Sequence, residues 1–173
     1  MDRGAMPQWV DDVVDELSRL GPEGVLSHLI SQELKRAELY HELYELSMEV
    51  TWDERVPKLF KILYENSLKR AEEYVNLFHE LFPGKPIEPP AIKAPGPRIL
   101  KDRLWKLVYS RNVGEIIEYL LQVEELFDRI LEKLEGSLSG DSKAVLLNIR
   151  NYENTNRNLL RELYRELTGK EPL

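Results

Sequence analysis

The last third of the chain places a carboxylate and an amide at a spacing that metal-binding helices use. Glu153 and Asn156 are three residues apart in a long segment with helical periodicity. Side chains at this spacing lie on the same side of a helix, where a Glu-x-x-His pair can share one metal ion. Asparagine is a poor ligand for iron or zinc, so the pair predicts a metal site that has lost a ligand.

Two more glutamates occupy matching positions in the two halves of the chain. Glu33 follows an apolar ladder at 25–30, and Glu124 follows a similar ladder at 116–121. Helical spacing puts both carboxylates near the buried face. A buried carboxylate without a partner is costly, so each glutamate predicts a polar or ionic contact inside the protein.

The chain also contains a literal Glu-x-x-His sequence, but we expect its side chains to lie on a different helix face from Glu33. It is formed by Glu38 and His41. Helical geometry places Glu38 roughly 140° and His41 about 80° around the helix from Glu33, so we expect both side chains to face solvent. No glycine-rich phosphate loop and no Ser/His/Asp arrangement is evident, and three histidines offer few candidates for acid–base chemistry.

Composition narrows the class of protein. The chain has 173 residues, 42% hydrophobic and 32% charged, which fits one globular domain. Its 24 Lys and Arg are dispersed among 31 acidic residues, so nucleic acid is not an expected partner. The absence of cysteine excludes disulfides and thiolate-held metals.

No apolar run approaches the roughly 18 residues of a membrane span and no signal peptide is evident, which predicts a cytoplasmic protein without a membrane partner. Only three glutamines suggest a thermophile.

The periodicity is helical throughout and predicts an all-α fold. Predicted helices cover 8–20, 23–50, about 51–81, 99–109, 112–134 and 142–168. The segment 83–98 contains six prolines and predicts an extended connection. Its 16 residues could reach about 50 Å, enough to cross the length of a four-helix bundle and leave its neighbouring helices parallel. We therefore expect a helix in 1–22 packed on a bundle formed by 23–173.

In helix order and in this long connection, residues 23–168 resemble the ferritin-like superfamily and, within it, the rubrerythrin-type proteins. The stretch 20–40 is similar to the first bundle helix of the family, with Glu33 seven residues before Tyr40. The stretch 56–72 is similar to the second. The resemblance implies a ferritin-like four-helix bundle and two irons, held by one Glu on each of two helices and by Glu-x-x-His on the other two.

Carried onto this chain, the resemblance assigns the ligand positions one at a time. Glu33 matches the ligand of the first helix and Glu124 that of the third. Glu153 matches the bridging glutamate of the fourth helix, and Asn156 replaces its histidine. Three carboxylates of the implied site therefore remain, and one of its histidines is lost.

The second bundle helix allows two registers. In the preferred register the family's Glu and His fall on Ser67 and Arg70, and in the other they fall on Glu65 and Leu68. Both registers lack the histidine. The preferred register also replaces a carboxylate by a hydroxyl and adds a cation.

These substitutions suggest a metal-free polar cluster. Without metal, neighbouring carboxylates repel one another and their pKa values rise. Arg70 offers several donors in a fixed geometry and can bind Glu33 and Glu153 where a metal would lie. In this hypothesis Ser67 and Asn156 complete the remaining hydrogen bonds.

Two alternatives stay open from the residues alone. One is a single-metal site made of Glu124, Glu153 and Asn156, and the other is that these positions face solvent. The favoured function is a non-catalytic structural or interaction protein without a cofactor. The alternative is an oxidative-stress protein that binds iron or another divalent metal, a non-haem iron oxidoreductase with peroxidase or ferroxidase-type activity. The partner expected is a second copy of the chain in a dimer.

Overall fold

The protein is all-α over the residues that the structure, a computed structural model, describes: 8–50, 53–91, 101–110, 112–137 and 140–172. Its helices are α1 (Gln8–Ser18), α2 (Pro22–Val50), α3 (Arg55–Leu81), α4 (Lys101–Ser110), α5 (Val113–Ser137) and α6 (Asp141–Thr168). The all-α prediction is confirmed. No helix in these ranges combines the length and the apolar character that crossing a membrane requires.

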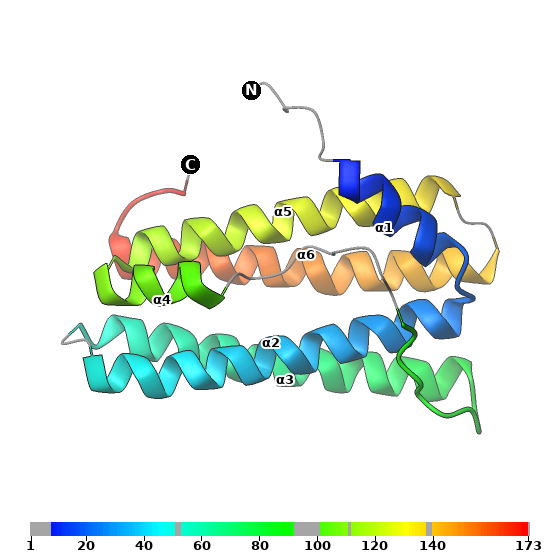
Figure 1. Cartoon of the computed structure of the whole chain (residues 1–173), viewed down its shortest axis with the longest axis horizontal. Helices are drawn as coiled ribbons and strands as arrows, with labels where there is room; N and C mark the ends of the chain where they lie inside the picture. Colours follow the sequence, from blue (N-terminus) through cyan, green and yellow to red (C-terminus); the bar gives the residue numbers. More distant parts are fainter. Residues whose placement is uncertain (1–7, 51–52, 92–100, 111, 138–139, 173) are drawn as a thin grey trace.

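The four long helices form two antiparallel pairs that lie side by side (Figure 1). The α2–α3 pair is the lower one in this view and the α5–α6 pair the upper one, with α1 packed on α5 and α4 lying at one end between the pairs. Four buried apolar residues fix α1 in place, namely Val10, Val13, Val14 and Leu17.

The helices α3 and α5 place the end of one and the start of the other at opposite ends of the molecule (Figure 1). α3 ends at the right of Figure 1 and α5 begins at the left, so these two helices run parallel. Residues 83 and 84 form a turn, residues 85–91 have no regular secondary structure, and residues 92–98 lie outside the described residues. α3 has 27 residues and is about 40 Å long, a distance within the reach expected of the connection.

Helix ends differ from the sequence predictions by a few residues. α2 begins at Pro22 because proline, which has no N–H to donate, is well suited to the first turn of a helix. α5 continues to Ser137, three residues beyond its predicted end. α6 ends as predicted, since Gly169 takes a left-handed conformation with φ of 70° and its N–H bonds the carbonyl of Arg165 at 2.9 Å.

The interior consists of two apolar clusters separated by a polar layer. One cluster surrounds Phe60 and Ile116, and the other surrounds Phe78 and Ile130. Along each long helix the chain passes from one cluster to the other. Between them, all four helices place polar or charged side chains in the interior: Glu33, Arg36, Ser67, Arg70, Glu124, Glu153 and Asn156.

Candidate functional site

The polar layer contains five buried charges drawn from four helices. They are Glu33 and Arg36 on α2, Arg70 on α3, Glu124 on α5 and Glu153 on α6. Arg36, the most exposed of them, has a relative accessible surface of only 8%. Burial on this scale requires every charge to have a partner, because an unpaired ion in the interior is strongly disfavoured.

Arg70 lies between the two carboxylates that the sequence assigned to it. Its Nη2 is 2.9 Å from Oε2 of Glu33, and its Nη1 is 3.1 Å from Oε2 of Glu153. One planar guanidinium group therefore joins α2, α3 and α6. The geometry is that of a cation bridging two acids.

Arg36 makes a second bridge, which the sequence reasoning missed. Its Nη1 is 3.2 Å from Oε1 of Glu33 and 3.0 Å from Oε1 of Glu124. Its guanidinium group also lies over the ring of Phe127, 5.5 Å from the centroid. A sequence signal was present, because Glu33 and Arg36 have the same three-residue spacing as Ser67 and Arg70.

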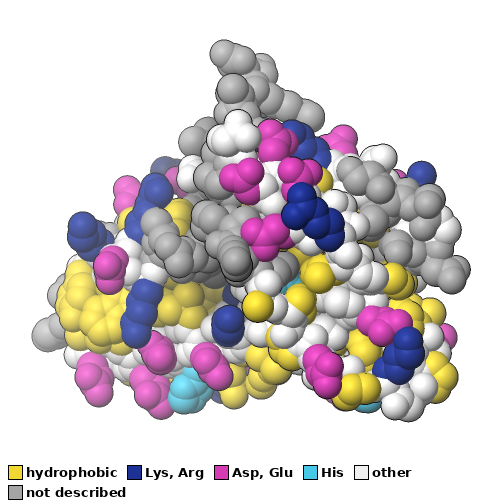
Figure 2. All heavy atoms as spheres, turned by 45° about the vertical axis from the view of Figure 1, so that its right-hand side comes forward, with side chains coloured by type: hydrophobic (Ala, Val, Ile, Leu, Met, Phe, Trp, Pro, Cys, Tyr) yellow, Lys and Arg dark blue, Asp and Glu magenta, His cyan; other side chains and the backbone are white. Residues whose placement is uncertain are grey.

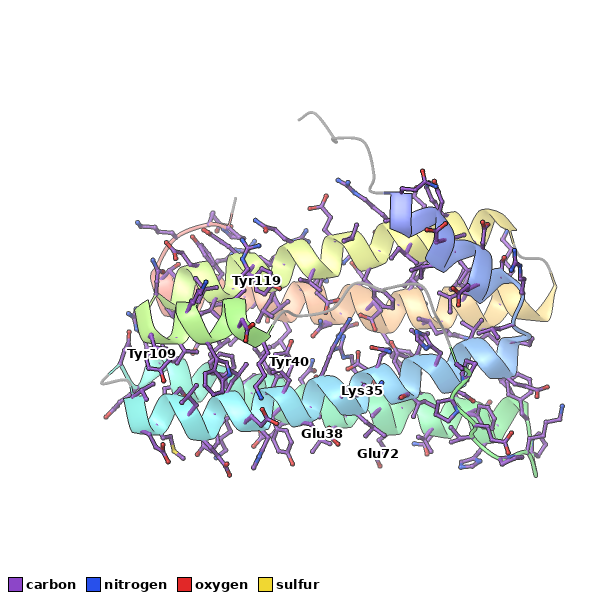
Figure 3. The ribbon with its side chains drawn as sticks, in the orientation of Figure 1. Lys35, Glu38, Tyr40, Glu72, Tyr109 and Tyr119 are labelled. Atoms are coloured by element: carbon purple, nitrogen blue, oxygen red, sulfur yellow. The ribbon has the colours of Figure 1, made fainter. Side chains whose placement is uncertain are left out.

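Two tyrosines extend the layer by one turn on α2 and α3. Tyr74 donates its hydroxyl hydrogen to Oε1 of Glu153 at 2.6 Å. Tyr40 is buried and lies between the two helix pairs (Figure 3). They follow Glu33 and Ser67 by seven residues, a spacing that keeps them on the same helix face. The contacts form a continuous chain: Glu124, Arg36, Glu33, Arg70, Glu153 and Tyr74.

The roles predicted for Ser67 and Asn156 need correction. Both side chains are buried in the polar layer. Among the described residues, however, the Ser67 hydroxyl makes no hydrogen bond. The Asn156 carbonyl oxygen instead accepts a hydrogen bond from Nδ2 of Asn66 at 2.8 Å. The further hydrogen bonds to Glu33 and Glu124 come from Arg36 instead.

The residues named in the two registers of the second bundle helix differ in burial. Ser67 and Arg70 are buried, whereas Glu65 and Leu68 are exposed. Glu38 is exposed as expected and lies on the outer side of the α2–α3 pair (Figure 3). The literal Glu-x-x-His therefore stays apart from the buried charges.

Comparison with known proteins finds a structural neighbour of similar length. No protein-family model matches the chain, and no curated protein matches it. A solved structure, hypothetical protein Pfu-1136390-001 from Pyrococcus furiosus, is similar with a TM-score of 0.55 and 20% sequence identity. The similarity covers 92% of this chain and 98% of that one. At this identity it shows a shared all-α fold.

The charges of the layer nearly cancel. Two arginines and three glutamates give +2 − 3 = −1 when all five are ionised. Burial alone would lower the pKa of Arg36 and of Arg70, but the carboxylates around them outweigh burial and raise both pKa values. Both guanidinium groups therefore stay charged, and the acids determine how the layer responds to pH.

The pKa values of the three buried glutamates shift in different directions. Burial raises the pKa of Glu124 to about 7, although the charge of Arg36 opposes the shift. Burial also raises the pKa of Glu33 against the charges of Arg70 and Arg36. At Glu153 the same burial effect is outweighed, because Arg70, Arg36 and the Tyr74 hydroxyl lower its pKa. When Glu124 holds a proton, the layer is neutral.

Removing one bridging cation should destabilise the protein strongly. Arg70→Met leaves two buried carboxylates without their shared partner, which should lower the free energy of unfolding by about 3–5 kcal/mol at pH 7. At pH 5 the loss should be smaller, because these carboxyl groups can take up protons instead. Chemical denaturation followed by circular dichroism at both pH values measures the two effects.

Arg129→Met is the matched control for this variant. Arg129 pairs with Glu125 at 3.0 Å on the surface of α5, where both side chains are partly or largely exposed. Its loss should cost less than about 1 kcal/mol. Equal losses for the two variants would contradict the role given to Arg70.

The raised pKa of Glu124 predicts that stability falls as pH rises. A carboxyl group with a higher pKa in the folded state binds its proton more tightly there than in the unfolded chain. The free energy of unfolding should therefore decrease as pH rises from the ordinary value of 4.5 through about 7. Glu124→Gln replaces the protonated acid by a neutral amide. From pH 5 to pH 8 the free energy of unfolding of this variant should therefore fall less than that of the wild type, with a difference of up to about 3 kcal/mol.

Urea unfolding at pH 5 and pH 8 tests this expectation, with Glu125→Gln as the control. Glu125 is the exposed neighbour of Glu124 on α5, so Glu125→Gln makes the same chemical change on the surface and leaves Glu124 in place. If Glu124→Gln keeps the pH dependence of the wild type, another group is responsible for it.

Proposed function

We propose that the chain is a ferritin-like four-helix bundle of the rubrerythrin type in which buried arginines have replaced the diiron centre. In this proposal the protein is not an enzyme. It acts in the cytoplasm as a structural or interaction protein, through self-association or through binding of a protein partner.

The observation that carries the proposal is the pair of guanidinium bridges. Arg36 bridges Glu33 and Glu124, and Arg70 bridges Glu33 and Glu153. The three glutamates are those that the resemblance assigns to iron ligands. The two guanidinium cations share the central carboxylate of Glu33, and each also binds one further carboxylate. Two metal ions in a dinuclear centre are connected in the same way, and here the permanent charges of side chains take the place of the ions.

The path of the chain supports the same proposal. The antiparallel pairs α2–α3 and α5–α6, with α3 parallel to α5 across a long connection, have the topology of a bundle with one crossover (Figure 1). The polar layer lies midway along the four helices, where such bundles bind metal between facing side chains.

The residues present do not fit two iron ions. All three carboxylates already bind arginine, and Arg70 and Asn156 stand at the positions where the resemblance expects histidine. Within the described ranges, no group of three or more His, Cys, Asp or Glu side chains is arranged to hold a metal ion. A ferrous ion placed here would be repelled by two guanidinium cations that cannot lose their charge.

Iron loading tests the proposal directly. After anaerobic incubation of the purified, untagged protein with Fe(II) and removal of free metal, we expect elemental analysis to find no retained iron. Retention of one or two irons per chain would overturn the metal-free interpretation. That result would favour the iron-dependent oxidoreductase, and assays with peroxide and dioxygen would follow.

Rebuilding the ligand set tests the assignment of positions. The variant Ser67→Glu, Arg70→His, Asn156→His restores the implied ligands but keeps Arg36 between two of the carboxylates. Adding Arg36→Leu removes that cation, so the quadruple variant should retain iron and the triple variant much less. The measurement is iron per folded chain after the same loading. A folded quadruple variant that takes up no iron would show that the ligand positions are wrongly assigned.

A further inference from the structure

Most of the large apolar side chains that are exposed lie on α2, α3 and α4. Six large hydrophobic residues are substantially exposed among those described: Leu34, Met48, Leu68, Leu81, Tyr109 and Leu147. Five of them lie on α2, α3 or α4, and only Leu147 lies on α6. Figure 2 shows hydrophobic side chains at the left of the molecule, bordered by acidic and basic ones. Single exposed apolar residues are ordinary, but Leu34 and Leu68 line the same groove, and neighbouring exposed apolar side chains indicate an interaction surface.

A groove runs along the outer side of the α2–α3 pair. Its volume is about 530 Å³, and its lining consists of Leu34, Ala37, Glu38, His41, Glu42, Tyr64 and Leu68. Leu34 and Leu68 have relative accessible surfaces of 46% and 39%, so they offer apolar area that the chain itself leaves uncovered. The α2–α3 groove therefore combines an apolar lining with the acidic side chains Glu38 and Glu42.

A smaller hollow on α4 has the opposite charge. Its volume is about 420 Å³, and it is lined by Lys101, Asp102, Arg103 and Lys106. Three cations and one anion give this α4 hollow a net positive charge. Tyr109, with a relative accessible surface of 55%, is one helical turn beyond Lys106 on the same helix. The α4 surface thus combines positive charge with an exposed aromatic ring.

The two surfaces are neighbours on the molecule. α2 packs against α4, and Nζ of Lys101 at the start of α4 is 2.6 Å from Oε2 of Glu42 in the groove. In Figure 3, Tyr109 lies near the left end of the molecule and Glu38 lies nearer its middle, on the outer side of α2. In a two-fold dimer, each copy contributes the same surface to the interface. That surface must therefore contain both complementary parts, one on either side of the symmetry axis.

We propose that the chain forms a two-fold dimer in which the α2–α3 groove of each copy receives the α4 surface of the other. The two-fold axis passes near the Lys101–Glu42 pair. The partner's Tyr109 packs on Leu34 and Leu68, and the basic α4 surface meets the acidic groove. A buried aromatic anchor surrounded by complementary charges is typical of stable interfaces.

Two free charges make the contact testable. Glu38 in the groove and Lys106 in the α4 hollow are exposed, and neither has an ion-pair partner among the described residues. Each can therefore be reversed without breaking an ion pair within its own chain. The dimer rests on the proposed function, since it specifies the self-association named there.

Mass measurement in solution is the first test. We expect wild type to have twice the chain mass of 20.3 kDa in size-exclusion chromatography with light scattering. Leu34→Glu should raise the dimer Kd at least about tenfold. Leu147→Glu is the matched control, because Leu147 also has a relative accessible surface of 46% but lies on α6, and this variant should remain dimeric. A monomeric wild type, or an equal response of the two variants, overturns the proposal.

Charge reversal gives a second test that does not depend on loss of folding. Glu38→Lys and Lys106→Glu should each form monomers, since like charges then meet at both contacts of the dimer. An equimolar mixture of the two variants should form a heterodimer, because the side chains at positions 38 and 106 then have opposite charges at both contacts. A mixture that stays monomeric overturns the proposed pairing.

These results are separable from the iron measurement. A monomeric protein that retains no iron would contradict the dimer and leave the metal-free cluster standing. A dimer that retains iron would contradict the metal-free function and leave the interface standing.

Discussion

The rest of the structure depends on two arginines holding three carboxylates in the middle of an otherwise apolar interior. Each long helix contributes at least one member of this network. Buried ion pairs recover much of the desolvation cost of their charges and often add little net stability. In this protein the larger effect of the ion pairs is to fix the position of each helix along its axis relative to the other helices. Sliding one helix by a turn, about 5.4 Å, would bring its charges into an apolar cluster and leave their partners unpaired.

The buried charges of the interior are paired with one another. The buried acids are bound to guanidinium groups, and the one literal Glu-x-x-His pair is on the outside. Features that could recognise another molecule are instead on the surface, where the α2–α3 groove and the α4 hollow carry opposite charges. The interior sets the positions of α2, α3 and α4, and those positions create the surface.

Much of the architecture could be predicted from the sequence because local signals determine it. Proline and glycine mark the helix ends, and helical spacing brought Glu33, Glu124 and Glu153 to the buried face. Arg70 was found through a resemblance rather than a pattern. Arg36 was missed because an arginine in a chain with 32% charged residues is ordinarily exposed, and its partner Glu124 is 88 residues away. The groove could not be predicted, since it depends on how closely two helices pack.

The distribution of the buried charges has a consequence for how the chain folds. The α2–α3 pair contributes Glu33, Arg36 and Arg70, a sum of −1 + 1 + 1 = +1, while the α5–α6 pair contributes Glu124 and Glu153, a sum of −2. Neither hairpin can neutralise its own part of the layer. Local contacts favour early formation of both hairpins, but their interior faces become compatible with burial only when they meet. We therefore expect the two hairpins to fold as one cooperative unit. Electrostatic attraction between their interior faces favours the step in which they dock together.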